Sequence, residues 1–226
     1  RSSDLIFQSY ALALHLKCFI LSFENVLSKV SFPQIVQPGM EKLGKICENH
    51  CHYQAAKKCY EFTLQAFLQK LGPEHNSVVT SYNSLGLLHG KMGDFEKAKK
   101  YHELALSVAQ KKLGPENVQV ATCYNNLGLV HDTLSDFEKA KKYHKLALRI
   151  KRERLGPENV QVAASYNNLG LVHDKMGHFE KAKEYHELAL NIRQKELGPE
   201  DVQVAACYNN LGSLHHRLGE IGRAHV

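Results

Sequence analysis

Residues 121–162 read ATCYNNLGLVHDTLSDFEKAKKYHKLALRIKRERLGPENVQV, and residues 163–204 read AASYNNLGLVHDKMGHFEKAKEYHELALNIRQKELGPEDVQV. The two stretches are identical at 28 of 42 positions. The tetrapeptide Leu-Gly-Pro-Glu keeps the same 42-residue period, beginning at Leu71, Leu113, Leu155 and Leu197. Such regular repetition indicates an array of like structural units.

Each unit has the pattern of two helices. In residues 121–162 the spacing predicts a first helix from about Val118 to Leu134 and a second from about Phe137 to Arg154. Tyr124, Leu127 and His131 fall on one face of the first helix. Ser135 and Asp136 mark the short turn between the two.

The Leu-Gly-Pro-Glu element is expected to end one unit and begin the next. Gly156 suits the left-handed conformation that closes a helix. Pro157 cannot continue that helix but fits the first turn of the following one. Glu158 then brings negative charge to a helix N-terminus, where the helix dipole stabilises it.

Small residues at fixed positions predict close helix packing. Gly128 and Ala140 let the paired helices approach, and Ala147 does the same toward the next unit. A single helix pair cannot bury its apolar face alone, so neighbouring units must stack. The sequence therefore predicts an all-α fold, an α-solenoid of stacked antiparallel helix pairs whose first helices line a concave surface.

Residues 40–220 resemble the tetratricopeptide repeat family. Leu127, Gly128, Ala140 and Ala147 match its signature spacing, with Tyr124 at the aromatic position. The 42-residue period and the Tyr-Asn-Asn-Leu-Gly motif are similar to the kinesin light chain and nephrocystin-like type. The resemblance implies a right-handed solenoid and a non-enzymatic protein-binding scaffold, with kinesin-linked cargo attachment or ciliary and sensor scaffolding as settings.

The ends of the chain do not follow the repeat. Residues 1–39 are a poorly defined segment, and the apolar stretch from Ile6 to Val30 is interrupted by polar and charged residues, so no membrane span is expected. It is either a soluble helical cap or a non-native translation. Residues 1–5 and 221–226 match peptides encoded by the two ends of a sequencing adapter, and we interpret both as scars.

Composition narrows the function classes. The net charge of +6 comes from lysines spread over several units, which argues against a nucleic-acid partner. The six cysteines are irregularly spaced, so we expect reduced thiols and a cytoplasmic protein. The chain has no Gly-rich phosphate loop, nucleophile elbow or metalloprotease motif, so no enzyme activity and no cofactor are expected.

Asparagine recurs on the first helices, although it is a poor residue for a helix interior. Its amide offers donors and an acceptor that suit the main chain of an extended peptide. The resemblance implies that these positions line the groove and hold ligand backbone; the alternative is that some tie neighbouring repeats together. The asparagines are Asn83, Asn125, Asn126, Asn167, Asn168, Asn209 and Asn210.

Further groove positions follow from helical spacing. A leucine row accompanies the asparagines, and the charges along it change in sign, which predicts a mixed groove rather than a strongly basic clamp for carboxylate tails. These positions are Leu87, Leu129, Leu171, Asp132, Asp174, Lys91, Lys175 and Arg217.

Histidine invites a metal hypothesis that the pattern does not favour. His89, His131, His173 and His215 repeat at a core position, and each unit would need its own metal. The denser group Cys47, His50, Cys51 and His52 lacks a second ligand pair. No metal site is therefore predicted.

The predicted function is that of a scaffold or adaptor that holds a peptide segment of a partner protein in the concave groove. The alternative is a regulatory or sensing repeat region of a larger multidomain enzyme or nucleotide-driven switch. The sequence predicts neither the partner nor the oligomeric state.

Overall fold

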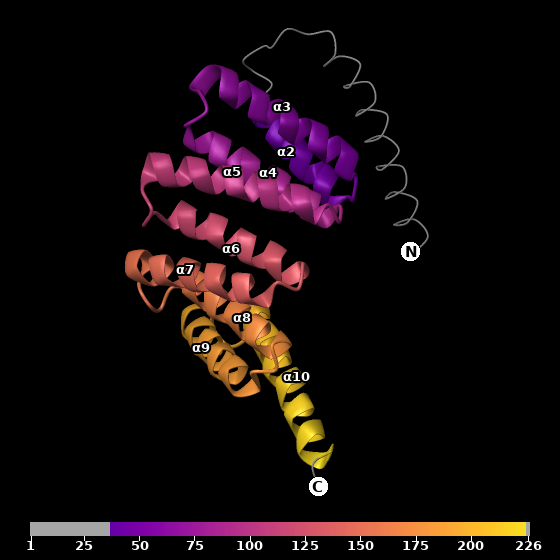
Figure 1. Cartoon of the computed structure of the whole chain (residues 1–226), viewed down its shortest axis with the longest axis vertical. Helices are drawn as coiled ribbons and strands as arrows, with labels where there is room; N and C mark the ends of the chain where they lie inside the picture. Colours follow the sequence, from indigo (N-terminus) through magenta and orange to yellow (C-terminus); the bar gives the residue numbers. More distant parts are fainter. Residues whose placement is uncertain (1–36, 225–226) are drawn as a thin grey trace.

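The computed structural model describes residues 37–224, which form nine α-helices and no strand (Figure 1). The expectations for residues 1–36 and for the last two residues lie outside the described part. The helices are α2 (Gln37–Asn49), α3 (Tyr53–Leu71), α4 (Asn76–Lys91), α5 (Phe95–Leu113), α6 (Val118–Thr133), α7 (Phe137–Leu155), α8 (Val160–Lys175), α9 (Phe179–Leu197) and α10 (Val202–Ala224).

The helices stack as antiparallel pairs, and the predicted all-α solenoid is confirmed. Each helix packs against the next one in the chain, and α4 also contacts α6, so first helices of adjacent repeats meet. Figure 1 shows the array bending, with the second helices α5, α7 and α9 toward its outer side. None of the helices in residues 37–224 is long and apolar enough to cross a membrane.

The turn between repeats differs from the expectation. Pro157 does not enter the first turn of a helix, because α8 begins at Val160 with Asn159 as its N-cap. The Asn159 side chain accepts the backbone N–H of Gln161 at 2.8 Å, which satisfies one free donor of the helix end. Gly156 has the expected positive φ of 86°, but its ψ of 156° is extended rather than left-handed helical.

In α4, α6 and α8 the repeated glycine leaves a space, which we call a socket, that an aromatic ring of the following helix fills. A Cβ on Gly128 would lie 2.6 Å from Cε1 of His144, and Gly86 and Gly170 face His102 and His186 in the same way. These imidazoles are 1% exposed. Burial lowers the pKa of His102 and of His144 to about 4, so the rings are neutral.

The predicted core histidines are buried beside tyrosines of the second helices. The ring of His131 stacks on that of Tyr143, and the ring of His173 on that of Tyr185, each with centroids 5.4 Å apart. Burial lowers the pKa of His89 and His131, although Asp94 and Asp136 oppose the shift. Burial, followed by the nearby His178, lowers the pKa of His173 to about 4.

The last helix, α10, has no second helix on its packing face within the described residues. Nothing lies within 4 Å of a Cβ built on Gly212, whereas Gly170 is filled by His186. His215 and Tyr208 are exposed, Tyr208 to 53%. The side chains that close the core in the earlier repeats therefore reach solvent here.

Candidate peptide-binding surface

The repeated asparagines form rungs between neighbouring first helices. We call the contact between the first helices of adjacent repeats a seam. In the last three seams the second asparagine of one repeat donates through Nδ2 to Oδ1 of the first asparagine of the preceding repeat. The bonds are Asn126 to Asn83 at 3.3 Å, Asn168 to Asn125 at 2.8 Å and Asn210 to Asn167 at 2.9 Å. Tying repeats together, one of the two roles considered from the sequence, is thus a role of all three pairs.

These asparagine pairs leave some amide donors and acceptors without a hydrogen bond inside the protein. Among the described residues, Nδ2 of Asn125 and of Asn167 and Oδ1 of Asn168 have no protein partner, and none of these atoms is fully buried. An amide donor and an amide acceptor therefore remain side by side in the seam, which is the pair that an extended peptide main chain needs.

Asn83 and Asn126 differ from the other asparagines. Oδ1 of Asn83 also receives Nδ1 of His102 at 3.0 Å, and its Nδ2 contacts Sγ of Cys123 at 3.4 Å, so both ends of this amide are occupied inside the protein. Asn126 is buried, with 7% of its surface exposed. Asn209 is exposed on the last helix.

The leucine row lies on the same helices and reaches solvent. Leu87 and Leu129 are 47% and 40% exposed, and Leu171 is partly buried. They occur one turn after the first asparagine of each repeat. Apolar side chains at 42-residue spacing beside free amide groups give the surface an amphipathic character.

The groove charges that the sequence placed along the row are paired across the seams. Lys175 binds Asp132 at 2.7 Å, Arg217 binds Asp174, and Lys91 binds Glu48 at 2.7 Å. The sequence predicts a change of sign along the groove, and the structure joins these charges into ion pairs between repeats.

One seam has no such ion pair. Gly90 and Thr133 occupy the positions at which the other seams carry a carboxylate and a cation. The seam between α4 and α6 is therefore joined by the Asn126–Asn83 rung without a charged rung. The absence of this ion pair could be predicted from the sequence, because neither of the two positions carries a charged residue.

The first seam contains a polar group that the sequence analysis missed. Glu48 is buried and accepts hydrogen bonds from Lys91 at 2.7 Å, Tyr60 at 2.7 Å and Lys45 at 3.2 Å. Burial raises the pKa of Glu48, but these hydrogen bonds outweigh it and bring the pKa below its ordinary value. A cavity of about 490 Å³ opens beside Glu48 and extends to Leu87.

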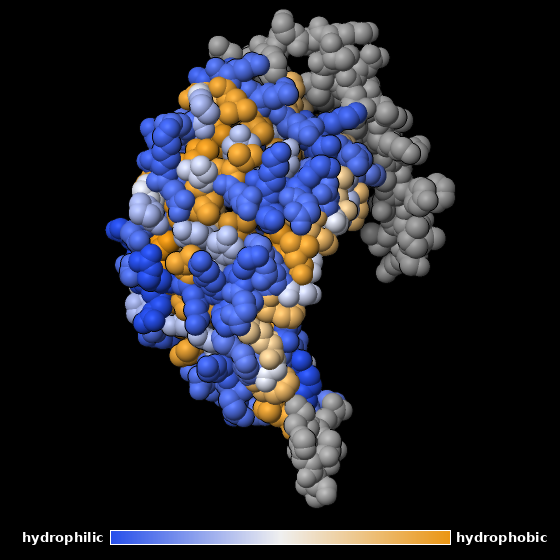
Figure 2. Space-filling model, viewed as in Figure 1, coloured by the Kyte–Doolittle hydropathy of each residue, from blue (hydrophilic) through white to orange (hydrophobic). Residues whose placement is uncertain are grey.

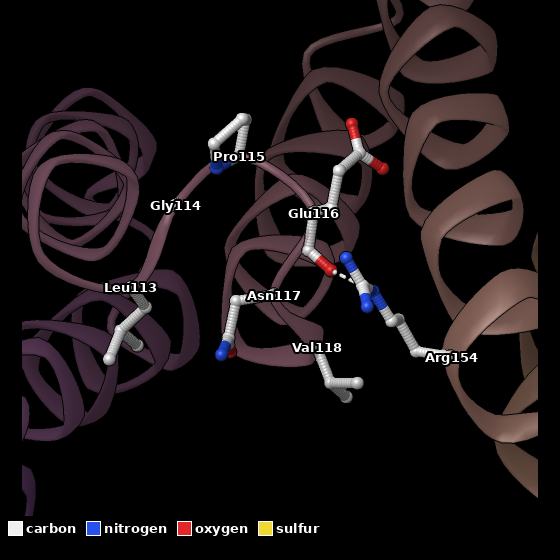
Figure 3. A pocket seen from close by; sticks show the side chains of 7 residues that line it. All are labelled: Leu113, Gly114, Pro115, Glu116, Asn117, Val118 and Arg154. Carbon is white, nitrogen blue, oxygen red and sulfur yellow. Dashed lines mark hydrogen bonds between the residues drawn. The ribbon is translucent and has the colours of Figure 1, made fainter.

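Another cavity, of about 410 Å³, lies at the turn before α6 (Figure 3). Arg154 reaches across from the end of α7, and its Nε donates to the backbone oxygen of Glu116 at 3.0 Å. Arg149 holds the carboxylate of the same residue at 2.9 Å. These contacts stabilise the turn, so we assign the cavity a structural role.

Metal ligands do not converge in the described part of the chain, where no group of three or more suitable side chains is found. Cys47 is buried in the core, and Cys51 is exposed in the turn after α2 with a φ of 61°. The two thiols of this segment thus lie in different environments.

Comparison with known proteins agrees with this geometry. The family model described as tetratricopeptide repeat matches residues 40–111, 84–153, 134–195 and 161–225. A search of curated proteins found no match.

Solved structures share the fold. The crystal structure of BtubC (BKLC) from P. vanneervenii has a TM-score of 0.71 and 28% identity, covering 82% of this chain and 74% of that chain. A candidate kinesin light chain from Podosopora anserina with nearly identical TPR-like repeats has a TM-score of 0.69 and 19% identity, covering 87% of this chain and 92% of that chain. Together with the family model and the repeat geometry, these likenesses lead to one conclusion: the chain belongs to the tetratricopeptide repeat family, in an array similar to those of kinesin light chain-like proteins.

Proposed function

We propose that this array is a non-enzymatic scaffold that holds an extended peptide segment of a partner protein against its first helices. Tetratricopeptide repeats generally mediate contacts between proteins. The observation that carries the finer proposal is the pair of unused amide groups in the α6–α8 seam, on Asn125 and Asn168, beside the exposed Leu129.

The chemistry of the surface suits a peptide. Free amide groups satisfy the N–H and C=O groups of an extended main chain, and the leucine row covers apolar side chains of the ligand. The ion pairs neutralise the charges at the seam, so we expect main-chain recognition to dominate over charge. Lys175 lies at the end of α8, and Asn209, Asn210 and Arg217 extend the same surface onto α10.

The setting is part of the proposal. The 28% identity with BtubC supports an adaptor of the kinesin light chain type. The thiols of Cys47, Cys51, Cys123 and Cys207 form no disulfide bond among the described residues, which supports a reducing compartment and hence the cytoplasm.

The test uses the two free Nδ2 donors. A peptide is selected from a random library on the wild-type array, and its place in the groove is checked by shifts of the Leu129 and Leu171 methyl resonances. Asn125→Ala with Asn167→Ala should weaken binding by about 1–2 kcal/mol, because two hydrogen bonds of ordinary net strength are lost. Isothermal titration calorimetry measures the affinity.

Asn83→Ala is the matched control. It removes the same side chain from the same repeat position, but the amide it removes is already occupied by His102, Asn126 and Cys123. It should reduce stability and leave peptide affinity unchanged. Equal affinity of the double variant and the wild-type protein would refute the asparagine assignment.

A further inference from the structure

The basic side chains of the array are concentrated on one outer helix. Helix α7 carries eight basic and two acidic side chains, whereas α9 carries four of each and α5 five basic and two acidic. The excess of six on α7 equals the net charge of the whole chain. Repeats that are otherwise so alike therefore differ in the charge of their outer face.

Four of these side chains form a line that we term the basic stripe: Lys142, Lys145, Arg149 and Arg152. They follow one another at intervals of three or four residues, which places them on one face of the helix, and all four are exposed. The stripe extends about 15 Å, from the helical rise per residue.

The neighbouring repeats continue the stripe at one position only, where Lys100 in α5 corresponds to Lys142. At the position of Lys145 stand Glu103 in α5 and Glu187 in α9, and at the position of Lys142 stands Glu184 in α9. Serine, asparagine and glutamine replace the two arginines. From Lys145 to Arg152 the positive surface is therefore one helix wide, and both neighbouring helices carry an acidic side chain beside it.

Most cations of the stripe lack a counter-charge within the described residues. Arg149 binds Glu116 at 2.9 Å, with Glu153 at 3.7 Å. The other acid of α7, Glu138, is taken by Lys141 at 2.7 Å. This leaves Lys142, Lys145 and Arg152 without an acidic partner in residues 37–224.

Two cavities with apolar side chains in their lining adjoin the stripe. Their volumes are about 590 and 460 Å³, and both are lined in part by Lys145 and Arg149. Leu146 lines the first cavity and Leu148 the second. Figure 2 shows small apolar patches among the hydrophilic side chains along the outer edge at the level of α7.

From these observations we infer that the outer face of α7 is a second docking surface, for an acidic amphipathic helix of a partner protein. A helix presenting carboxylates every three or four residues matches the spacing of the stripe, since both helices have the same rise. Its apolar side chains pack into the cavities beside Leu146 and Leu148. This surface is on the opposite side of the repeats from the groove and does not depend on the proposed function.

Because the stripe is narrow, it suits a single acidic helix better than an extended anionic surface. A phosphate backbone or a lipid surface that covered the stripe would also meet Glu103, Glu184 and Glu187, whose charge repels it. A single helix avoids these flanking carboxylates.

The experiment uses the full chain and an amidated peptide of glutamate, leucine and alanine, roughly 18 residues or five helical turns long. Its glutamates recur every three or four positions beside a leucine row, and a second peptide has the same composition in scrambled order. Binding is measured by fluorescence anisotropy at low and high salt. The patterned peptide should bind at least about tenfold more tightly than the scrambled one, and high salt should weaken its binding several-fold.

Two charge-reversal variants decide whether the stripe is the site. Lys142→Glu, Lys145→Glu and Arg152→Glu together should weaken binding by about tenfold or more, because three attractions become repulsions. Lys42→Glu, Lys112→Glu and Lys181→Glu together change the net charge equally but lie off the stripe, and they should retain most of the affinity. Thermal melting of both variants checks their folding.

Three results would overturn the inference. The first is equal binding of the patterned and scrambled peptides, and the second is an equal loss of peptide affinity in the two variants. Either result would mean that net charge alone, and not the stripe, causes the binding. The third is tighter binding to duplex DNA or to phosphatidylserine vesicles than to the patterned peptide, which would assign the stripe to a different class of partner.

Discussion

Helices α8 and α10 are identical at 11 of their first 16 positions but have different environments. Leu169 and His173 of α8 are buried beneath α9, while Leu211 of α10 is only partly buried and His215 is exposed. Tyr166 stacks on Tyr185 with centroids 6.0 Å apart, whereas Tyr208 is 53% exposed. The comparison teaches that the second helix, and not the sequence of the first, determines whether these residues become core.

The largest expected effect comes from the glycine sockets of these two helices. Gly170→Ala places a Cβ 2.6 Å from Cε1 of His186, and overfilling this packed contact should cost about 1–3 kcal/mol. Gly212→Ala meets no atom within 4 Å and should stabilise α10 by about 0.5–1 kcal/mol, because alanine is the better helix former. Urea unfolding of both variants measures the difference. Changes of the same sign would show that the socket is not what separates the two helices.

The next effect is a dependence of stability on pH. The pKa of His173 is lowered to about 4 in the folded protein, below the unfolded value near 6.5. Its stabilising contribution is therefore complete above about pH 6.5 and is lost as the pH falls toward 4. At pH 5 we expect a loss of about 1–2 kcal/mol from this residue, by the linkage between pKa and stability.

Phenylalanine substitutions in α8 and in α10 test which histidine causes this pH dependence. His173→Phe removes one buried imidazole, so the free energy of unfolding should fall less between pH 7 and pH 5 than in the wild-type protein. His215→Phe leaves the buried imidazoles in place and should retain the wild-type fall. Identical pH profiles of the two variants would contradict the burial of His173 as the cause.

The smallest effect concerns the seams. The α8–α10 seam has the Arg217–Asp174 pair, while the α4–α6 seam has Gly90 and Thr133 at these positions. Gly90→Asp with Thr133→Lys should install the missing pair, with a coupling energy of about 0.2–1 kcal/mol in a double-mutant cycle. The two single variants correct for the change in helix propensity at Gly90. A coupling energy of zero would mean that the seam cannot bring the two positions together.

Much of the fold follows from the sequence because it depends on local spacing. The spacing predicts the second helix of residues 121–162 from Phe137 to Arg154, and α7 ends one residue later, at Leu155. The period, the small residues and the helix-breaking glycine are all properties of neighbouring positions. Pro157 was placed wrongly because the Asn159 cap two residues later competes for the helix start.

The site was predicted less completely, because its contacts join residues 43 positions apart. Helical spacing placed Asn125, Asn168, Asp132 and Lys175 on the right helices, but it did not show which of them meet. That depends on the stagger between stacked repeats, which no periodicity within one helix reveals. The regular repetition of the second-helix histidines argues for packing, but for the same reason it did not show that their rings face Gly86, Gly128 and Gly170.

The asparagine pairs and ion pairs between repeats make it simple for such an array to gain a repeat. The unit of residues 163–204 carries both halves of every seam contact: Asn168 and Lys175 bind the preceding repeat, and Asn167 and Asp174 bind the following one. A tandem duplication of its coding DNA would join each copy to the next with the same amide and ion pairs. The repeat number of a gene built from such units can therefore change in single steps, because each new copy already contains the contacts that attach it.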